Sequence, residues 1–186
     1  MVAKIPEDLL FCSERDILQY VRQHVLGMTQ PQMYVKVKGS WTGGHEENLR
    51  YRAINLNHGP GGSEWSCVPC SASREFREAV RDTYRVDIYK NEGLWYADAD
   101  FCLARKIPIY NFIQQEGDLV ILGPGCEHWV REVGETAVHT AWNFGTMDKW
   151  QLEQSIARMD VNNKINFKVS FRSLKIFFSL LYQTGL

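Results

Sequence analysis

The chain has almost no excess of charge, no long apolar run and no regular spacing of cysteines. Its 21 Lys and Arg nearly balance 22 Asp and Glu, so a net charge of −1 gives no global basic field to attract nucleic acid or an anionic membrane surface. No segment approaches the ~18 apolar residues that span a bilayer, and the first residues lack the apolar stretch of a signal peptide. These absences argue against direct DNA binding and membrane insertion, and they predict a soluble intracellular protein.

The five cysteines are an odd number with irregular spacing, which gives no disulfide framework and fits a reducing compartment. Cys67 and Cys70 form a lone C-x-x-C motif. Without a second Cys or His pair at finger spacing, the motif supplies only half of a tetrahedral zinc site. We interpret these two residues as buried or strand-end thiols, with zinc or redox use as the less favoured alternative.

The aromatic content, with six Trp, eight Tyr and nine Phe among 186 residues, predicts a folded chain. A single domain of this size removes roughly 70% of its unfolded surface from water. Apolar residues at helical spacing after a capping arrangement predict an N-terminal helix over 13–27, and similar spacing predicts helices near 76–84 and 150–159. Residues 91–106 are expected to be irregular, with a helical turn near Phe101.

Alternating polarity over residues 33–38 predicts a strand, and its polar side, with Tyr34 and Lys36, is a candidate ligand-facing side. Gly and Pro punctuation predicts further short strands, and the last four are expected to form a series of antiparallel hairpins. Their spacing, without long interleaved helices, is typical of a sandwich or jelly roll. The predicted fold class is therefore mainly β with flanking helices, and the further strands cover 50–57, 64–68, 109–114, 118–122, 127–133 and 137–144.

The most informative feature is a set of metal-ligating residue types. His45 and Glu47 stand two apart, so on an extended segment both side chains leave the same face, while Glu46 points to the other. His128 follows a tight turn far along the chain, where a strand can bring it back to this face. A lone histidine after two glycines is more often a surface loop residue. Two imidazoles and one carboxylate together predict a non-heme Fe(II) site with open positions for a cosubstrate and dioxygen.

Several ordered blocks of sequence resemble the JmjC domain of UTX-type histone demethylases, the subfamily acting at histone H3 tail position 27. The resemblance covers roughly residues 24–163. It implies a helical lead-in over 1–30, a JmjC jelly-roll catalytic domain (double-stranded β-helix, cupin-like) over 31–163 and a divergent tail over 164–186. The matching blocks are 34–48, 54–65, 107–114, 117–120, 128–130 and 141–143.

The resemblance implies a dioxygenase that uses Fe(II), 2-oxoglutarate and O2 to hydroxylate an N-methyl group of a histone H3 lysine, and the methyl group then leaves as formaldehyde. His45, Glu47 and His128 would be the catalytic iron ligands. The implied partner is the methylated histone H3 tail, with chromatin complexes as further partners and the nucleus as the implied location.

Other positions match residues that bind the cosubstrate or the substrate in this family. Lys36 and Thr42 match the residues that hold the distal carboxylate of 2-oxoglutarate, while Asn55 and His139 match positions near it. Tyr34 matches a residue lining the methylammonium pocket, where an aromatic face favours a quaternary cation. The alternatives are ordinary ones: a solvated strand lysine for Lys36, a turn-capping asparagine for Asn55 and strand packing for Tyr34.

Departures from the family pattern favour reduced turnover. Lys38 and Gly43 stand where the family has prolines, Ala53 replaces a serine, and His139 replaces an asparagine near the cosubstrate. Changes in such supporting residues commonly cost 10–100-fold in metal affinity or activity. The sequence also has no cysteine after Cys126, so the cysteine-rich zinc module of UTX-type proteins is absent from it. Three alternatives remain open: a JmjC protein hydroxylase, a weakly active or inactive JmjC chromatin-binding protein, and a non-oxidative cupin holding zinc or manganese.

Overall fold

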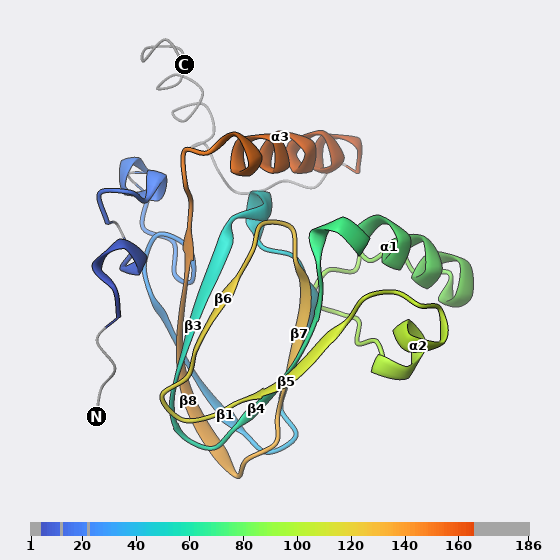
Figure 1. Cartoon of the computed structure of the whole chain (residues 1–186), viewed down its shortest axis with the longest axis horizontal. Coiled ribbons are helices and arrows are strands. Elements are labelled where there is room, and N and C mark those ends of the chain that lie inside the picture. The colour runs from blue at the N-terminus through green and yellow to red at the C-terminus, as the bar shows by residue number, and fades with distance from the viewer. Residues whose placement is uncertain (1–4, 12, 22, 166–186) are drawn as a thin grey trace.

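The computed structural model describes residues 5–11, 13–21 and 23–165. Two four-stranded antiparallel sheets face each other, with strand orders β1-β8-β3-β6 and β2-β7-β4-β5 (Figure 1). This jelly roll confirms the predicted fold class. The strands are β1 Gln32–Val37, β2 Trp41–His45, β3 Arg52–Pro60, β4 Ser63–Val68, β5 Tyr110–Gln114, β6 Leu119–Leu122, β7 Glu127–Glu132 and β8 Thr136–Phe144, and the helices are α1 Cys70–Tyr84, α2 Ala99–Ala104 and α3 Lys149–Lys164, with 3-10 helices at Glu7–Leu9, Ile17–Tyr20 and Asn48–Arg50.

The predicted series of hairpins after residue 109 is wrong, because successive strands alternate between the two sheets. β5 pairs with β4 and β6 with β3, while β7 lies between β2 and β4, and β8 lies between β1 and β3. Gly117 and Gly125, at φ of 85° and 69°, lie in the connections that carry the chain across to the opposite sheet. Turn residues mark where a strand ends but carry no information about its partner. The alternation places β7 beside β2.

The N-terminal helix predicted over 13–27 is also wrong. Among the described residues of this range, 13–21 and 23–27, the only helix is the 3-10 helix Ile17–Tyr20, and the side chain of Asp16 caps it by accepting a hydrogen bond from the Leu18 backbone N at 3.0 Å. The same carboxylate accepts from the backbone N of Gly145 at 3.0 Å, and the Ile17 N donates to the Gly145 carbonyl at 2.9 Å. These contacts with the end of β8 outweigh the helical spacing.

The space between the sheets holds only a small apolar cluster, whereas a larger one lies on the far side of the second sheet, under α1 and α2. Phe76 of α1 stacks on Trp129 of β7, with ring centroids 5.8 Å apart and an interplanar angle of 13°. Because side chains alternate along a strand, anchoring Trp129 outward directs its neighbour His128 inward. The inner cluster consists of Ala53, Trp65, Cys67, Val120, Leu122 and Val130.

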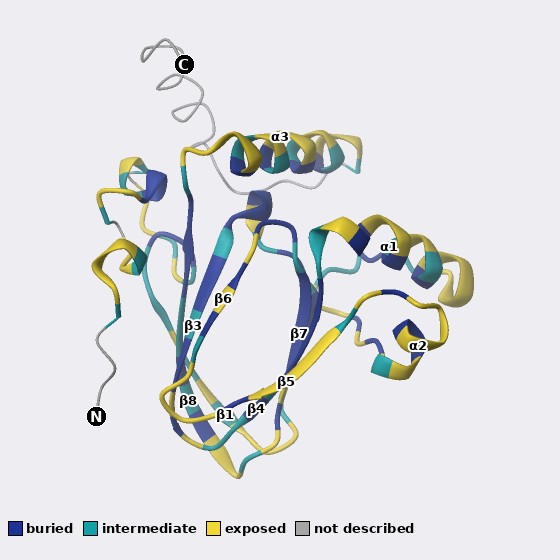
Figure 2. Ribbon diagram, in the orientation of Figure 1, coloured by how far each residue is buried: buried dark blue, intermediate teal, exposed yellow. Residues whose placement is uncertain are grey.

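The predicted C-terminal helix is confirmed as α3, but its buried face is polar. Of the three residues on which the prediction rested, Trp150 and Ile156 are exposed, and Met159 is half-buried against the apolar cluster around Leu49. Figure 2 shows both buried and exposed positions along α3. The helix packs on the 3-10 helix Asn48–Arg50, where Ser155 Oγ donates to the Leu49 carbonyl at 2.8 Å. In the described part of the chain, no helix combines the length and apolar character needed to cross a membrane. The buried residues of α3 are Gln151, Ser155, Arg158 and Asn162.

The end of β2 packs tightly against the loop at residues 93–95. The Gly44 backbone N donates to the Trp95 carbonyl at 2.6 Å, and the Gly93 N donates to the Gly44 carbonyl at 2.8 Å. A Cβ atom at Gly44 would lie 2.3 Å from the Trp95 ring. The backbone that leads into His45 therefore has no room for a larger residue.

We expect Gly44→Ala to lower the free energy of unfolding by about 1–3 kcal/mol, because the added methyl overpacks a rigid contact with an indole ring. Urea denaturation would measure the change. Gly123→Ala is the matched control, since its Cβ would meet its nearest neighbour at 3.8 Å, an ordinary contact. Equal stability of the two variants would contradict the prediction.

Candidate metal centre

Three candidate ligands converge at one end of the space between the sheets. His45 ends β2, Glu47 follows it, and His128 on β7 is the direct register partner of His45. The Oε1 atom of Glu47 lies 3.8 Å from Nε2 of His45 and 3.5 Å from Nε2 of His128. One donor atom from each residue lies within 4.8 Å of the others, and among the described residues no other such group of three is found. The structure thus brings together the three residues that the sequence singled out.

Neighbouring groups fix the orientation of all three side chains. Nδ1 of His45 lies 2.8 Å from the Gly43 carbonyl, and Nδ1 of His128 lies 3.1 Å from the Cys126 carbonyl. A carbonyl only accepts, so each Nδ1 carries the proton and each Nε2 keeps a lone pair directed at the shared space. The other oxygen of Glu47 accepts a hydrogen bond from the side chain of Asn143 at 2.8 Å. The donor set fits a divalent metal ion.

The buried environment of His128 favours its neutral, metal-binding form. Burial lowers the pKa of His128 well below its usual value, and the charge of Lys36 acts in the same direction. The Trp65 ring stacks on the imidazole, with centroids 5.8 Å apart and an interplanar angle of 18°. The ring is therefore held both by its backbone hydrogen bond and by an aromatic neighbour.

Lys36 and Thr42 lie on the inward faces of their strands. The alternation over β1 is as predicted, and the apolar side is the exposed one. Burial lowers the pKa of Lys36, and the nearby Glu132 opposes that shift. Lys36 pairs with the buried Ala137, and Tyr34 pairs with the buried His139, so both β1 residues lie on the inward face of the sheet. Thr42 pairs with Val130, a member of the inner cluster. Lys36 is therefore half-buried and not a fully exposed strand lysine.

Asn55 and His139 contact each other on neighbouring strands. Nδ1 of His139 lies 2.9 Å from Oδ1 of Asn55, and Gln114 donates to the same oxygen at 3.3 Å. The turn-capping alternative for Asn55 is wrong because Asn57 performs that role: it donates to the Gly61 carbonyl at 2.8 Å and accepts from the Gly59 N. Asn55 is thus free of the turn and lies beside His139.

His139 is completely buried and bonded at both ring nitrogens. Its Nε2 lies 3.0 Å from the hydroxyl of Ser63, which also contacts a carboxylate oxygen of Glu132 at 2.7 Å. Burial lowers the pKa of His139 to about 4, with the charges of Lys36 and His58 contributing. At neutral pH the side chain is therefore uncharged.

The depressed pKa of His139 predicts a loss of stability in mild acid. An unfolded histidine titrates near pH 6.5, so between about pH 6.5 and 4 the unfolded state binds more protons, and the free energy of unfolding falls as the pH drops. Over the whole window the effect is about 3 kcal/mol. Urea denaturation of His139→Asn at pH 6.5 and 4.5 should show a smaller decrease than the parent chain. The control His24→Gln, at an exposed site, should show the same decrease in the free energy of unfolding as the parent chain. Parallel decreases in all three proteins would contradict the prediction.

Tyr34 lies on the same side of the sheets as the candidate ligands. Burial raises the pKa of Tyr34, and the charge of Glu47 adds to the increase, so the phenol lies within electrostatic reach of that carboxylate. A hollow of about 290 Å³ opens next to the ligands, and its lining residues include His45, Glu47 and Glu92. The metal centre is therefore accessible from one side.

Sequence reasoning missed three supporting side chains: Asn143, which orients Glu47, Trp65, which stacks on His128, and Ser63, which bonds to the buried imidazole of His139. All three lie inside the blocks that resemble a known family, 54–65 and 141–143, so the family resemblance was the signal that could have pointed to them. Cys67 is buried on β4 and Cys70 begins α1, and neither belongs to the group of three donors.

Comparison with known proteins agrees with this geometry. The family model described as "JmjC domain, hydroxylase" matches residues 32–144, from the start of β1 to the end of β8. The chain belongs to the JmjC family. Both sheets lie inside the matched range, and so do the three candidate ligands. The resemblance inferred from the sequence blocks is thereby confirmed.

Among curated JmjC relatives, Lysine-specific demethylase 6B of Homo sapiens is 36% identical over 165 residues, covering 89% of this chain and 10% of the relative. Lysine-specific demethylase jmjd-3.1 of Caenorhabditis elegans is 31% identical over 161 residues, covering 87% and 15%. Lysine-specific demethylase REF6 of Arabidopsis thaliana is 26% identical over 124 residues, covering 62% and 9%. The chain thus spans only about a tenth to a seventh of the length of these relatives.

Proposed function

We propose that this JmjC chain is an Fe(II)- and 2-oxoglutarate-dependent dioxygenase that removes methyl groups from a lysine of the histone H3 tail, at the repressive mark of position 27. The observation that carries the proposal is the convergence of His45, Glu47 and His128 within 4.8 Å, with Lys36 directed into the same interior. The names of its relatives support a lysine substrate. A chromatin substrate makes the nucleus the proposed place of action.

His45, Glu47 and His128 would hold the iron through two Nε2 atoms and a carboxylate oxygen. Fe(II) bound at this site would activate dioxygen, and the oxidation of 2-oxoglutarate would drive that activation. The protein's contribution is orientation: the two backbone carbonyls hold the imidazole tautomers, and Asn143 holds the carboxylate. Because other groups of the protein hold the ligand side chains in place, the ligands need little rearrangement to bind a metal.

Lys36 would bind the distal carboxylate of 2-oxoglutarate, with Thr42, Asn55 and His139 as further contacts. The ammonium group is inside the fold, where burial disfavours its charge, so an entering carboxylate gives it a partner. A charge-assisted hydrogen bond of this kind contributes about 1.5–3 kcal/mol. His139 is neutral at pH 7, so its ring offers the cosubstrate hydrogen bonding rather than a second charge.

Tyr34 would line the pocket for the methylated ammonium group of the substrate. An aromatic ring and a nearby carboxylate both favour a quaternary cation, and Tyr34 lies within reach of Glu47. In the overall reaction one oxygen atom of dioxygen becomes bonded to the methyl carbon, and this carbon leaves as formaldehyde. The other oxygen atom enters succinate as 2-oxoglutarate loses carbon dioxide.

The test is mass spectrometry of a panel of methylated histone H3 peptides after incubation with the protein, Fe(II) and 2-oxoglutarate. Demethylation removes 14 Da per step, and the position-27 peptide should lose mass fastest. Reactions without 2-oxoglutarate serve as the control. Unchanged peptide masses across the panel, with no succinate released, would contradict the proposal and favour a JmjC fold that binds chromatin without turnover.

A gain of 16 Da on the peptide would instead indicate a protein hydroxylase, the alternative favoured by the description of the matching family. Zinc or manganese binding without any dependence on 2-oxoglutarate would indicate a non-oxidative cupin. Lys36 argues against that last function, because an enzyme without a dicarboxylate cosubstrate has no need for an inward cation at this depth.

A further inference from the structure

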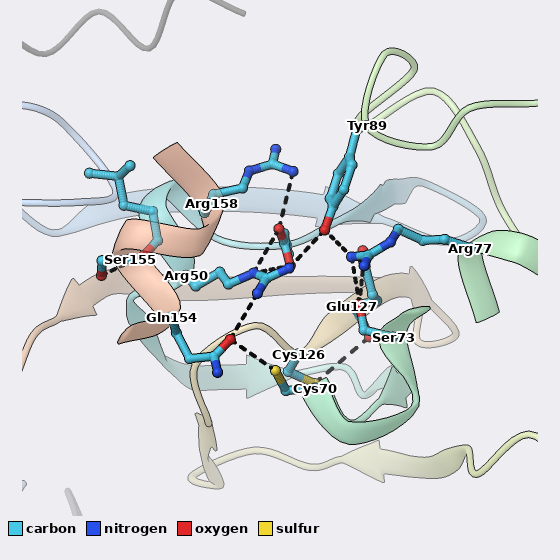
Figure 3. Close-up of polar contacts among 12 residues, drawn as sticks. Arg50, Cys70, Ser73, Arg77, Tyr89, Cys126, Glu127, Gln154, Ser155 and Arg158 are labelled. Carbon is cyan, nitrogen blue, oxygen red and sulfur yellow. Dashed lines mark hydrogen bonds and ion pairs between the residues drawn. The ribbon is translucent and has the colours of Figure 1, made fainter. Parts of the chain in front are cut away.

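Each of the two segments that carry candidate ligands also presents a buried carboxylate on its opposite side. Glu46 stands between His45 and Glu47, and Glu127 directly precedes His128. Glu46 is 3% exposed and Glu127 is 1% exposed. Since adjacent side chains on an extended backbone alternate, the ligands point between the sheets while the two carboxylates point outward. There they meet α1, α3 and the loop that contains Tyr89 (Figure 3).

Glu46 is bound by two arginines from different elements. Nε of Arg50 lies 3.2 and 3.1 Å from the two carboxylate oxygens, and Nη1 of Arg158 on α3 lies 3.1 Å from one of them. Arg158 also donates to both oxygens of Glu92 at 3.1 Å, and Glu92 accepts from the Glu46 backbone N at 3.4 Å. Both the side chain and the backbone between the first two ligands are therefore held from outside.

Glu127 is bound in the same way from α1. It accepts hydrogen bonds from Ser73 Oγ at 2.9 Å and from Nη1 of Arg77 at 3.3 Å. Burial and the charge of Glu46 raise the pKa of Glu127 to about 8, although Arg77 and Ser73 oppose the shift, so these partners lie close enough to act on its carboxyl group. The residue before the third ligand is thus fixed to a helix on the far side of the sheet.

Tyr89 links the two halves. Its hydroxyl accepts a hydrogen bond from Arg50 at 2.8 Å and another from Arg77. The guanidinium carbons of Arg77 and Arg158 also lie 4.4 and 4.1 Å from its ring centroid. A continuous path therefore runs from Glu46 through Arg50, Tyr89 and Arg77 to Glu127. Figure 3 shows its part from Arg50 to Glu127.

The energetics of burial show what such a network contributes. It contains three carboxyl groups, from Glu46, Glu92 and Glu127, and three guanidinium groups, from Arg50, Arg77 and Arg158. Buried ion pairs add little net stability relative to apolar packing, since the desolvation of the charges offsets their attraction. They are directional, however, and they penalise displacement of either partner. The network therefore acts on geometry more than on the stability of the fold.

We propose that this ionic frame fixes the spacing of the two ligand segments, which makes Glu46 and Glu127 positioning residues for the metal centre. The inference rests on the proposed function only in that the three donors bind a divalent metal. Neither carboxylate belongs to the group of three donors, although Glu46 and Glu92 line the same hollow as His45 and Glu47. We expect loss of a frame contact to lower the metal affinity, because the three donor atoms would no longer be held at the distances that suit one metal ion.

Titration of the metal-free protein with Co(II), followed by the visible absorption bands of the bound ion, tests the proposal without any turnover. Glu46→Gln and Glu127→Gln should each raise the Co(II) dissociation constant by about 10–100-fold. Tyr89→Phe keeps the ring and removes only the bridging hydroxyl, so it should fold readily and raise the dissociation constant by about two- to tenfold. Urea denaturation of each metal-free variant gives its stability separately.

Asp148→Asn is the matched control. Asp148 caps the first turn of α3 and pairs with Arg52 of β3 at 3.1 Å, so its loss weakens the start of the helix and removes no contact of the ionic frame. The control should lose stability but keep the Co(II) affinity of the parent chain. Unchanged affinity in the Gln and Phe variants would overturn the proposal, as would an equal loss of affinity in Asp148→Asn. Failure of the parent chain to bind Co(II) would overturn the proposed function and this inference with it.

Discussion

Replacing His45 by alanine is expected to abolish both succinate release and peptide demethylation. The change removes one of three donor atoms and leaves a carboxylate and a single imidazole, Glu47 and His128, to hold the metal. Loss of one donor costs more than the 10–100-fold typical of a supporting residue. Succinate release with and without peptide, measured beside the change in peptide mass, would detect any remaining turnover.

His58→Ala is the matched control for this experiment. His58 lies exposed on β3, where its ring contacts the Thr140 hydroxyl at 2.7 Å, and it is not part of the group of donors. Its replacement should leave turnover at the level of the parent chain. Thermal unfolding adds a second measurement, because a metal at 100 times its dissociation constant stabilises the folded state by about 2.7 kcal/mol. Metal-dependent stabilisation that survived in His45→Ala would contradict the assignment of this residue as a ligand.

Replacing Lys36 by methionine is expected to raise the KM for 2-oxoglutarate by about 10–150-fold, the equivalent of losing a charge-assisted hydrogen bond of about 1.5–3 kcal/mol. Methionine keeps the length and apolar stem of the side chain and removes only the charge. The assay is initial rate against 2-oxoglutarate concentration at saturating peptide. Affinity for Co(II) without cosubstrate should stay close to that of the parent chain.

Lys38→Met provides the control, two residues further along the chain. Lys38 lies exposed after the end of β1 and pairs with Glu135 at 2.7 Å, so its charge already has a partner at the surface. Its loss should change the KM for 2-oxoglutarate less than twofold, as expected for an exposed ion pair. Equal changes in the two variants would show that general charge attraction, not a specific contact, draws in the cosubstrate.

The sequence predicted the strands and the candidate ligands more fully than it predicted how they pair. Alternation over residues 33–38 reveals a strand and its polar face because the period of two is local. The residue types of His45, Glu47 and His128 can also be read directly from the sequence, and the combination of two imidazoles with a carboxylate indicates a metal site. The register of β7 beside β2 depends on which sheet each connection reaches, and no short pattern of residues encodes that.

The polar face of α3 shows a second limit. Trp150 and Ile156 suggested a helix packed through apolar side chains, yet the helix docks through Ser155 and Arg158 onto backbone carbonyls and buried carboxylates. A pattern of polar residues at helical spacing is ambiguous, since solvent and a buried ionic network both satisfy such residues. Only the partners, Glu46 and Glu92, distinguish the two, and they lie far away in the sequence.

Apolar side chains are divided unequally between the two sides of the second sheet. The residues that stabilise the fold are therefore largely different from the residues that line the proposed catalytic site. The larger apolar cluster on that sheet lies outside, around Phe76 and Trp129, while the space between the sheets holds a smaller one. Lining positions such as Ala53 and His139 can therefore change during evolution with modest loss of foldability. A family built this way can diversify its chemistry while its scaffold stays intact.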